Sequence, residues 1–171
     1  DRTSRGLGDV YKRQVLTGVY FNNQDEKTEL AATDSYRLAT QQISNFPIND
    51  VGIISFKSLS EVIRLFENEE ETLNINSNEK DLYFFNDKYF ASLRKVEGTF
   101  PEYQNLFPKE TLFTAEIDKK EILESLDRST VVAEGYIPVT FIFENNENLT
   151  ITTLNKAVSY THLRAHETYD H

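Results

Sequence analysis

The 171-residue chain contains no cysteine, and its three histidines lie at the C-terminal end, at positions 162, 166 and 171. Residues 15–157 therefore cannot supply a Ser-His-Asp triad, a cysteine nucleophile or a histidine-based zinc site. His162 and His166 would share one face of a helix, but no third ligand is near them, so we expect no metal site. The lack of cysteine agrees with a reducing compartment, and we expect a cytoplasmic protein.

Long apolar runs and glycine-rich loops are also missing. No segment approaches 18 apolar residues and no secretory signal opens the chain, so we expect no membrane partner. The six glycines form no phosphate-binding loop. Carboxylates are plentiful, but none has the spacing of an acid/base pair or of an oxygen-ligand cage. We therefore predict that the protein is not an enzyme and binds no cofactor.

What the chain does contain indicates a globular domain, with 39% hydrophobic residues, 12 Phe and 9 Tyr. Residues 1–14 and 158–171 differ in character from the middle, and we predict that both are non-native tails outside the fold. Residues 15–157 hold 13 Lys and Arg against 24 Asp and Glu. This acidic balance disfavours nucleic-acid binding by net charge alone, although a local basic stripe acts within about 8–10 Å.

Alternating apolar residues predict antiparallel strands on both sides of a central helix. The strands are expected at residues 15–21, 28–33, 37–43, 51–55, 72–76, 81–85 and 89–96, with a turn over residues 22–27. Ser58 and Glu61 fit a capping box that starts the helix, and Leu59, Val62, Ile63 and Phe66 would form its apolar face. Lys57 and Arg64 would lie on the opposite face, either as ordinary solvated charges or as a basic stripe.

The same order of elements recurs after a Gly/Pro-punctuated linker that ends at Pro108. A strand at residues 112–117 precedes a second capping box, Asp118 and Glu121, with Ile117 and Ile122 as a hydrophobic staple. Ile122, Leu123 and Leu126 would be its buried face, and a hairpin follows with strands that end at Glu144 and begin at Leu149. Two copies of one α+β module is the simplest interpretation, with residues 15–108 and 109–157 as separate domains.

The segment Ala31–Ala39 (AATDSYRLA) breaks the strand alternation with a turn-prone Asp-Ser pair. One interpretation is local: Asp34 and Ser35 turn the chain, and Arg37 pairs with Asp34. The other is that the segment forms part of a binding site, which depends on what else the chain contains.

Three stretches in order resemble the bacterial sliding clamp, the β subunit of DNA polymerase III. They are Leu16-Thr17-Gly18-Val19 with Phe21, Ala32–Ala39, and Glu97–Tyr103 (EGTFPEY). The resemblance covers about residues 15–157. It implies an α+β fold of sliding-clamp (processivity-fold) modules, with antiparallel sheets outside and helices on one face. Residues 15–108 would be most of the middle domain and 109–157 the first half of the third.

The resemblance also implies a function, that of a DNA polymerase processivity factor. Such a clamp is a head-to-tail homodimeric ring that encircles duplex DNA without sequence specificity, and Lys57 and Arg64 would face the DNA. The first domain, the opening of the middle domain and the end of the third are expected to be absent from this chain. We therefore do not expect these 171 residues to close a ring or to bind a partner at full strength.

The family's partners, polymerase and clamp loader subunits among them, insert short Leu/Phe-containing peptides into a hydrophobic pocket. Ser35 and Tyr36 stand where a Gly-His pair is common, Asn105 where Arg is common, and Thr17 where Asn is usual. Carried over residue by residue, the pocket wall would comprise Leu16, Thr33, Ser35, Tyr36, Arg37, Leu38, Pro101, Asn105 and Leu106.

Two other functions remain compatible with the sequence. The first is a β-rich peptide-binding or small-molecule-binding domain unrelated to DNA, and the second is a hydrolase that acts through carboxylates.

Overall fold

The computed structural model describes residues 13–69, 72–132, 138–144, 147–153, 156–162 and 164–166, the last two segments as backbone only. The chain divides into two compact units, Asp1–Asn105 and Leu106–His171. The division falls three residues before the boundary expected after Pro108. Each unit is described by itself.

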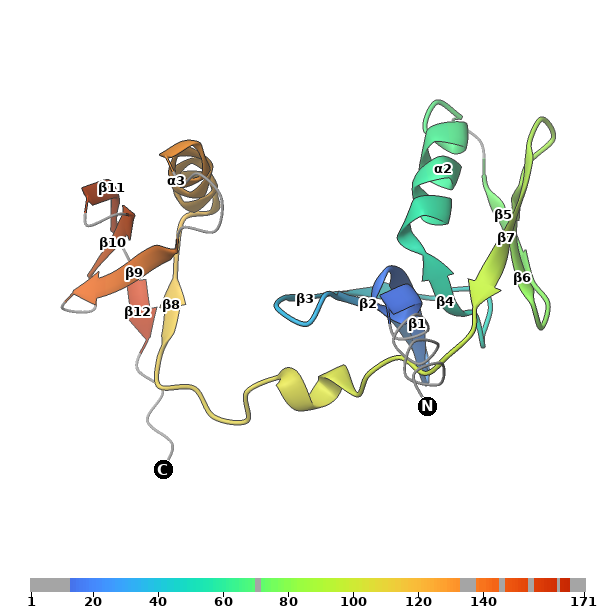
Figure 1. The fold of residues 1–171 in the computed structure, drawn as a ribbon, viewed down its shortest axis with the longest axis horizontal. Coiled ribbons are helices and arrows are strands. Elements are labelled where there is room, and N and C mark those ends of the chain that lie inside the picture. The colour runs from blue at the N-terminus through green and yellow to red at the C-terminus, as the bar shows by residue number, and fades with distance from the viewer. Residues whose placement is uncertain are drawn as a thin grey trace, which may run out of the picture. The chain divides into compact units, whose positions relative to one another are not determined.

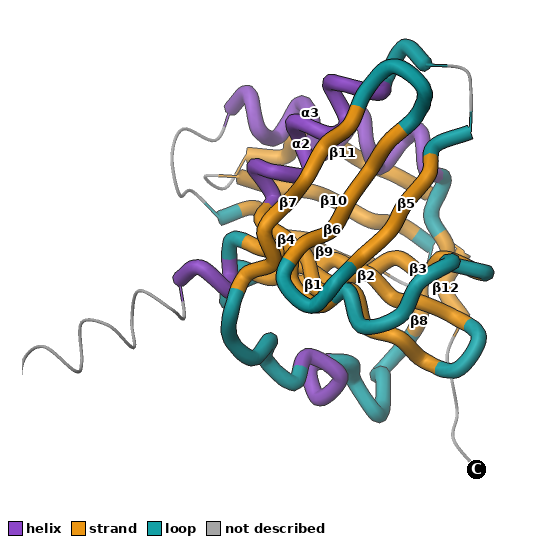
Figure 2. Tube along the Cα trace, turned by 90° about the vertical axis from the view of Figure 1, so that its right-hand side faces the viewer, coloured by secondary structure: helices purple, strands orange, loops and turns teal. Residues whose placement is uncertain are grey.

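The first unit contains a seven-stranded sheet and an 11-residue α-helix (Figure 1). Its strands, in the order β3-β2-β1-β4-β7-β6-β5, all pair in antiparallel fashion. Figure 2 shows β5, β6 and β7 lying side by side as a meander. The bounds are β1 Gly18–Gln24, β2 Lys27–Thr33, β3 Leu38–Ser44, β4 Gly52–Ser55, α2 Phe56–Phe66, β5 Asn74–Ser77, β6 Asp81–Phe85, β7 Phe90–Val96 and the 3-10 helix η1 Tyr103–Leu106.

Strand β4 connects two apolar clusters on opposite faces of this sheet. Successive side chains of a strand point to opposite faces, and Ile53 and Ile54 are both buried. Ile54 packs under α2 in a buried cluster, here called the first cluster. Its members are Phe21, Val51, Ile54, Val62, Leu82 and Leu93. Ile53 belongs to the second cluster, which contains Val15, Ala31, Ile53, Phe100 and Tyr103 and is here called the η1-side cluster.

The start of the chain differs from the predicted strand at residues 15–21. Residues 13–16 are helical, and β1 begins only at Gly18. The Thr17 amide donates to the carbonyls of Arg13 and Gln14, each at 3.1 Å, and this closes a helical turn. A Cβ on Gly18 would lie 2.4 Å from Ile53 Cγ2, so β1 passes close to β4 at a position where a side chain would collide. The turn predicted over residues 22–27 is shorter, with only Asp25 and Glu26 between the strands.

Helix α2 begins earlier than predicted. Its N-cap is Ser55, whose hydroxyl accepts a hydrogen bond from the Ser58 amide at 3.1 Å. The prediction of a capping box at Ser58 and Glu61 is therefore wrong. Three of the predicted apolar positions, Leu59, Val62 and Phe66, contact the first cluster. Ile63 is 65% exposed and does not belong to the buried face.

The second unit contains β8 Thr114–Glu116, α3 Lys119–Val132, β9 Val139–Glu144, β10 Asn148–Thr153, β11 Lys156–His162 and β12 Arg164–His166. Strands β11, β10 and β9 form one antiparallel sheet, and β12 pairs with β8. Residues 158–162 and 164–166 are therefore strands, although we expected residues 158–171 to lie outside the fold. Whether either tail is native stays a prediction. The turn at residues 145–146 lies outside the described residues.

The second helix confirms one cap and corrects one face. The Glu121 amide donates to Asp118 Oδ1 at 2.9 Å, and Ile117 and Ile122 pack with Leu126 on buried Leu149 and Ile151. Leu123, predicted on the buried face, is 53% exposed. Ser125 and Ser129 are buried in its place, and each hydroxyl bonds the carbonyl four residues earlier.

Candidate functional site

The loop between β2 and β3, residues 34–37, is held by its own side chains. Asp34 Oδ1 accepts the amides of Tyr36 and Arg37, both at 3.1 Å, and the Thr33 hydroxyl donates to the Arg37 carbonyl at 2.8 Å. Ser35 has φ 76, a left-handed conformation that such a tight bend requires. The predicted turn at Asp34 and Ser35 is confirmed.

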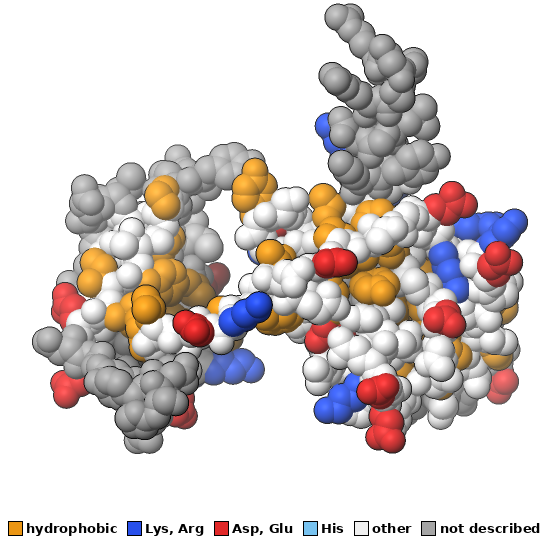
Figure 3. Space-filling view, turned by 90° about the horizontal axis from the view of Figure 1, so that it is seen from below, with side chains coloured by type: hydrophobic (Ala, Val, Ile, Leu, Met, Phe, Trp, Pro, Cys, Tyr) orange, Lys and Arg blue, Asp and Glu red, His pale blue; other side chains and the backbone are white. Residues whose placement is uncertain are grey.

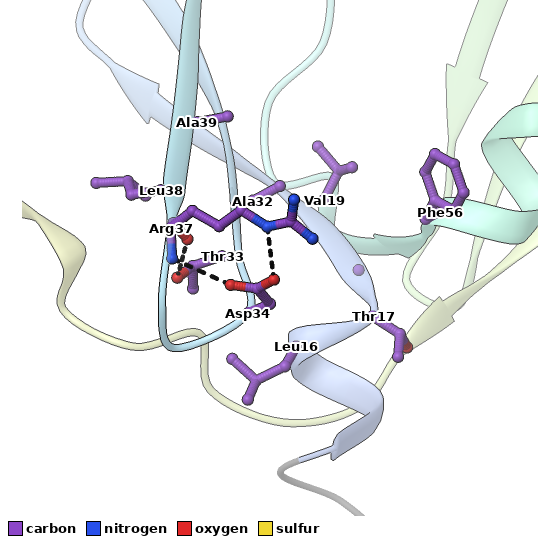
Figure 4. Close-up of a pocket in the computed structure, with 11 residues that line it drawn as sticks. Leu16, Thr17, Val19, Ala32, Thr33, Asp34, Arg37, Leu38, Ala39 and Phe56 are labelled. Atoms are coloured by element: carbon purple, nitrogen blue, oxygen red, sulfur yellow. Dashed lines mark hydrogen bonds and ion pairs between the residues drawn. The ribbon is translucent and has the colours of Figure 1, made fainter. Parts of the chain in front are cut away.

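An ion pair within this loop fixes the direction of Arg37. The Arg37 Nε atom lies 2.8 Å from Asp34 Oδ2, as the local interpretation predicted (Figure 4). This bond, followed by the bond from the Tyr36 amide, lowers the pKa of Asp34 below its usual value. The same pairing raises the pKa of Arg37. The loop therefore presents a guanidinium whose charge is locally balanced.

Titration of Asp34 should show this pairing directly. In an NMR titration we expect the pKa of Asp34 to lie below the usual value of an aspartate, and we expect Arg37→Ala to raise it, because the largest cause of the shift is removed. The pKa should remain lowered in that variant, since the backbone donors remain. Since the folded-state pKa is lowered, the stabilisation is present above about pH 4 and is lost as the pH falls through the folded-state pKa. An identical midpoint in the two proteins would contradict the pairing.

Beside the loop lies an apolar hollow of about 560 Å³ (Figure 4). Its walls come from the helical turn at Leu16, from the adjacent ends of β1, β2 and β3, and from the first residue of α2. The lining residues are Leu16, Thr17, Gly18, Val19, Ala32, Thr33, Asp34, Arg37, Leu38, Ala39 and Phe56. A hollow of this size and composition can bury apolar side chains, with the Asp34–Arg37 pair as its polar edge.

The hollow includes four of the predicted pocket residues, namely Leu16, Thr33, Arg37 and Leu38. The other predicted residues do not line it. Ser35 and Tyr36 point to solvent from the loop, with Tyr36 97% exposed. Pro101 before η1 and Asn105 within η1 are both exposed, and Leu106, 64% exposed, is the first residue of the second unit.

Sequence reasoning missed Phe56 and the small residues of the hollow, such as Ala32 and Ala39. Ala32 and Ala39 are direct cross-strand partners, a register that follows from the hairpin around the loop. Phe56 reaches the hollow because its amide donates to the Thr17 carbonyl at 2.9 Å, which joins the start of α2 to β1. Only the register of Ala32 and Ala39 has a local sequence signal.

The η1-side cluster packs against, or is adjacent in sequence to, some of the predicted pocket residues. Leu38 packs against it, and the cluster residue Val15 directly precedes Leu16. Tyr20 stacks on Phe100 with ring centroids 5.1 Å apart. Several segments that carry predicted pocket residues are therefore anchored in one packed layer.

Helix α2 carries the two predicted DNA-facing residues, and both are exposed. Arg64 Nη1 lies 3.3 Å from Glu61 Oε1, an exposed pair of small energetic value. Among the described residues no ion pair of Lys57 is found. On the face that Figure 3 shows, basic and acidic side chains are interspersed, with hydrophobic side chains gathered between them.

The described residues contain no group of three or more His, Cys, Asp or Glu side chains placed to hold a metal ion. None of their helices is long and apolar enough to cross a membrane.

The sequence of this chain is similar to a family profile and to proteins of the same family. A family profile described as "DNA polymerase III beta subunit, central domain" matches residues 1–102. A beta sliding clamp of Staphylococcus aureus is 32% identical over 135 residues, which are 77% of this chain and 36% of that protein. The chain thus spans about a third of that relative's length.

Solved structures agree in fold. The DNA polymerase III beta subunit of Thermotoga maritima has a TM-score of 0.74 and 22% identity over 94% of this chain and 45% of that one. A Bartonella birtlesii sliding clamp bound to griselimycin has a TM-score of 0.73 and 23% identity over 93% of this chain and 45% of that one. With the family profile covering more than half of its residues, this chain belongs to the DNA polymerase III beta subunit family, the beta sliding clamps.

Proposed function

We propose that this chain is part of a ring clamp that encircles duplex DNA and tethers polymerase and other replication proteins through a peptide-binding pocket. The observation that carries the proposal is the apolar hollow formed by Leu16, Thr33, Arg37 and Leu38. Peptide sites of this kind gain affinity by burying a few apolar anchors in a desolvated pocket. The griselimycin complex of a clamp with this fold is consistent with a ligand site in the family.

The proposed contact with DNA is based on helix α2. Lys57 and Arg64 are exposed, seven residues apart on one helix, and so lie about two turns apart on similar faces. The weak Glu61 pair leaves Arg64 able to contact phosphate. Contacts of this kind hold DNA without reading its sequence and weaken as salt increases. No bond needs to be made or broken, so the proposed function is not catalytic.

The organisation of the chain follows from the same proposal. Residues 15–108 would be most of the middle domain of the clamp, and residues 109–157 the first half of the third. The head-to-tail homodimer, the encircled DNA and the partner proteins would then belong to the full-length protein. The recurrence of β4–α2–β5–β6–β7 as β8–α3–β9–β10–β11 supports two related modules.

Two assays on the full-length protein test this function. A labelled peptide with Leu and Phe anchors should bind saturably, whereas the same peptide with both anchors changed to Ala should not. Protein loaded on circular DNA should be retained and should be lost when the DNA is cut, because a ring slides off a free end. Equal retention on circular and linear DNA would overturn the clamp function, and failure of the anchored peptide to bind would overturn the pocket.

A further inference from the structure

Two side chains, Phe100 and Tyr103, anchor the segment around η1 in the η1-side cluster. Between Pro101 and Leu106, a stretch that the structure describes in full, every other residue is exposed, while Tyr103 is 1% exposed. Its ring packs edge-on against Phe100 with centroids 5.8 Å apart, inside the η1-side cluster that also contacts Leu38. Phe100 anchors the chain just before Pro101, and Tyr103 is the one buried anchor between Pro101 and Leu106.

The hydroxyl of Tyr103 contacts two polar side chains that the sheet register places next to each other. Asn22 on β1 and Glu29 on β2 are direct cross-strand partners. The hydroxyl donates to Glu29 Oε1 and accepts from Asn22 Nδ2 at 3.0 Å. Glu29 is 8% exposed, and a buried carboxyl group without a hydrogen-bond partner is costly. A phenol at this point satisfies both groups, which a phenylalanine could not do.

Apolar packing is non-directional, whereas a hydrogen bond has a preferred distance and angle. Two hydrogen bonds of opposite direction fix the distance and the direction of the Tyr103 side chain, and so of its backbone. Pro101 and Asn105 lie two residues to either side, and the Tyr103 amide donates to the Pro101 carbonyl at 2.8 Å. Both residues belong to the predicted pocket wall, although both are exposed and neither lines the hollow itself.

We propose that Tyr103, through its hydrogen bonds to Glu29 and Asn22, is a positioning residue that sets Pro101 and Asn105 for peptide binding. This inference rests on the proposed peptide-binding function. It assigns the role to groups that do not touch the peptide. Burial, followed by the bond to Glu29, raises the pKa of Tyr103 to about 12, so the phenol keeps its proton under all ordinary assay conditions.

The test compares hydroxyl and acceptor variants in the full-length protein, using the labelled Leu/Phe peptide. Tyr103→Phe keeps the ring and removes the hydroxyl together with its bonds to Glu29 and Asn22, and we expect peptide affinity to fall about fivefold. Glu29→Met removes the acceptor and should cost a similar factor. Glu29→Gln keeps an acceptor oxygen and should retain more affinity than Glu29→Met. The double variant Tyr103→Phe with Glu29→Met should lose no more than the larger single loss, because both changes break one interaction.

Tyr83→Phe is the matched control. The Tyr83 hydroxyl also takes part in a side-chain hydrogen bond, which it accepts from Asn78 at 2.7 Å. Tyr83 lies on β6, and strands β4 and β7 separate β6 from β1 and β2, the strands that Tyr103 contacts. Tyr83→Phe should leave peptide affinity unchanged even if it lowers stability, which separates positioning from general destabilisation. Wild-type affinity in Tyr103→Phe would overturn the inference alone. Failure of the wild-type protein to bind the peptide would overturn the proposed function and the inference together.

Discussion

Replacing Ile54 with alanine will lower the free energy of unfolding of the first unit by about 2–5 kcal/mol. Ile54 is 0% exposed in the cluster under α2, so truncation removes buried methyl groups and leaves a cavity between α2 and the sheet. A loss of this size is a large fraction of the stability of an ordinary domain. Urea denaturation of the 171-residue chain, followed by far-UV circular dichroism, measures the change.

Ile63→Ala is the matched control, since it makes the same chemical change on α2. Its side chain is 65% exposed, and the expected change lies within about 0.5 kcal/mol. Equal losses in the two variants would mean that the α2 face is assigned wrongly. The comparison also tests the corrected helix face, because helical periodicity placed Ile63 inside.

Leu38→Asp in the full-length protein should weaken binding of the Leu/Phe peptide by about 3 kcal/mol, or roughly 100-fold. Leu38 lines the hollow and is half-buried against the η1-side cluster, so a carboxylate there would be desolvated when an apolar anchor enters. Fluorescence anisotropy with the labelled peptide gives the dissociation constants. Unchanged affinity would remove Leu38 from the pocket.

Leu73→Asp introduces the same charge beside β5, the strand at the opposite edge of the sheet from β3. Leu73 is 39% exposed and does not line the hollow, so peptide affinity should stay at the wild-type level. Thermal melts of both variants show whether the loss in Leu38→Asp reflects unfolding. Tyr36→Asp provides a second probe without that risk, because its 97% exposed side chain can change without disturbing the core, and a smaller loss of affinity is expected.

Local signals in the sequence were sufficient for much of the fold. Strands β6 and β9 end where predicted, at Phe85 and Glu144, because polar turns bound a clear alternation on each side. The cap at Asp118 and the Asp34–Arg37 pair were also predictable, since both join residues three apart. The fold class follows from these elements.

The start of α2 was not accessible in the same way. Ser55 and Ser58 are equally good caps by residue type. The choice depends on where β4 ends, and that is set by pairing with β1, in which Ser55 faces Gly18. The exposed position of Ile63 has a related origin, because periodicity marks an apolar stripe but not how much of it the sheet reaches.

Some residues of the candidate site could likewise be predicted from the local sequence, and others could not. Residues near the loop, such as Thr33 and Leu38, could be placed by motif and register. Phe56 enters the hollow through a bond to a different strand, and Glu29 meets Tyr103 across 74 residues of sequence. Interactions at that separation have no periodic signature, so only the folded chain shows them.

The adjacent isoleucines of β4 have a consequence for how the first unit opens. Ile53 and Ile54 support the η1-side cluster and the cluster under α2 from one strand. We therefore expect the layer under α2 and the layer behind the hollow to open together, because both lose apolar contacts when β4 is displaced. A substitution that weakens β4 would then be expected to weaken the proposed contacts with DNA and the proposed binding of partner peptides together.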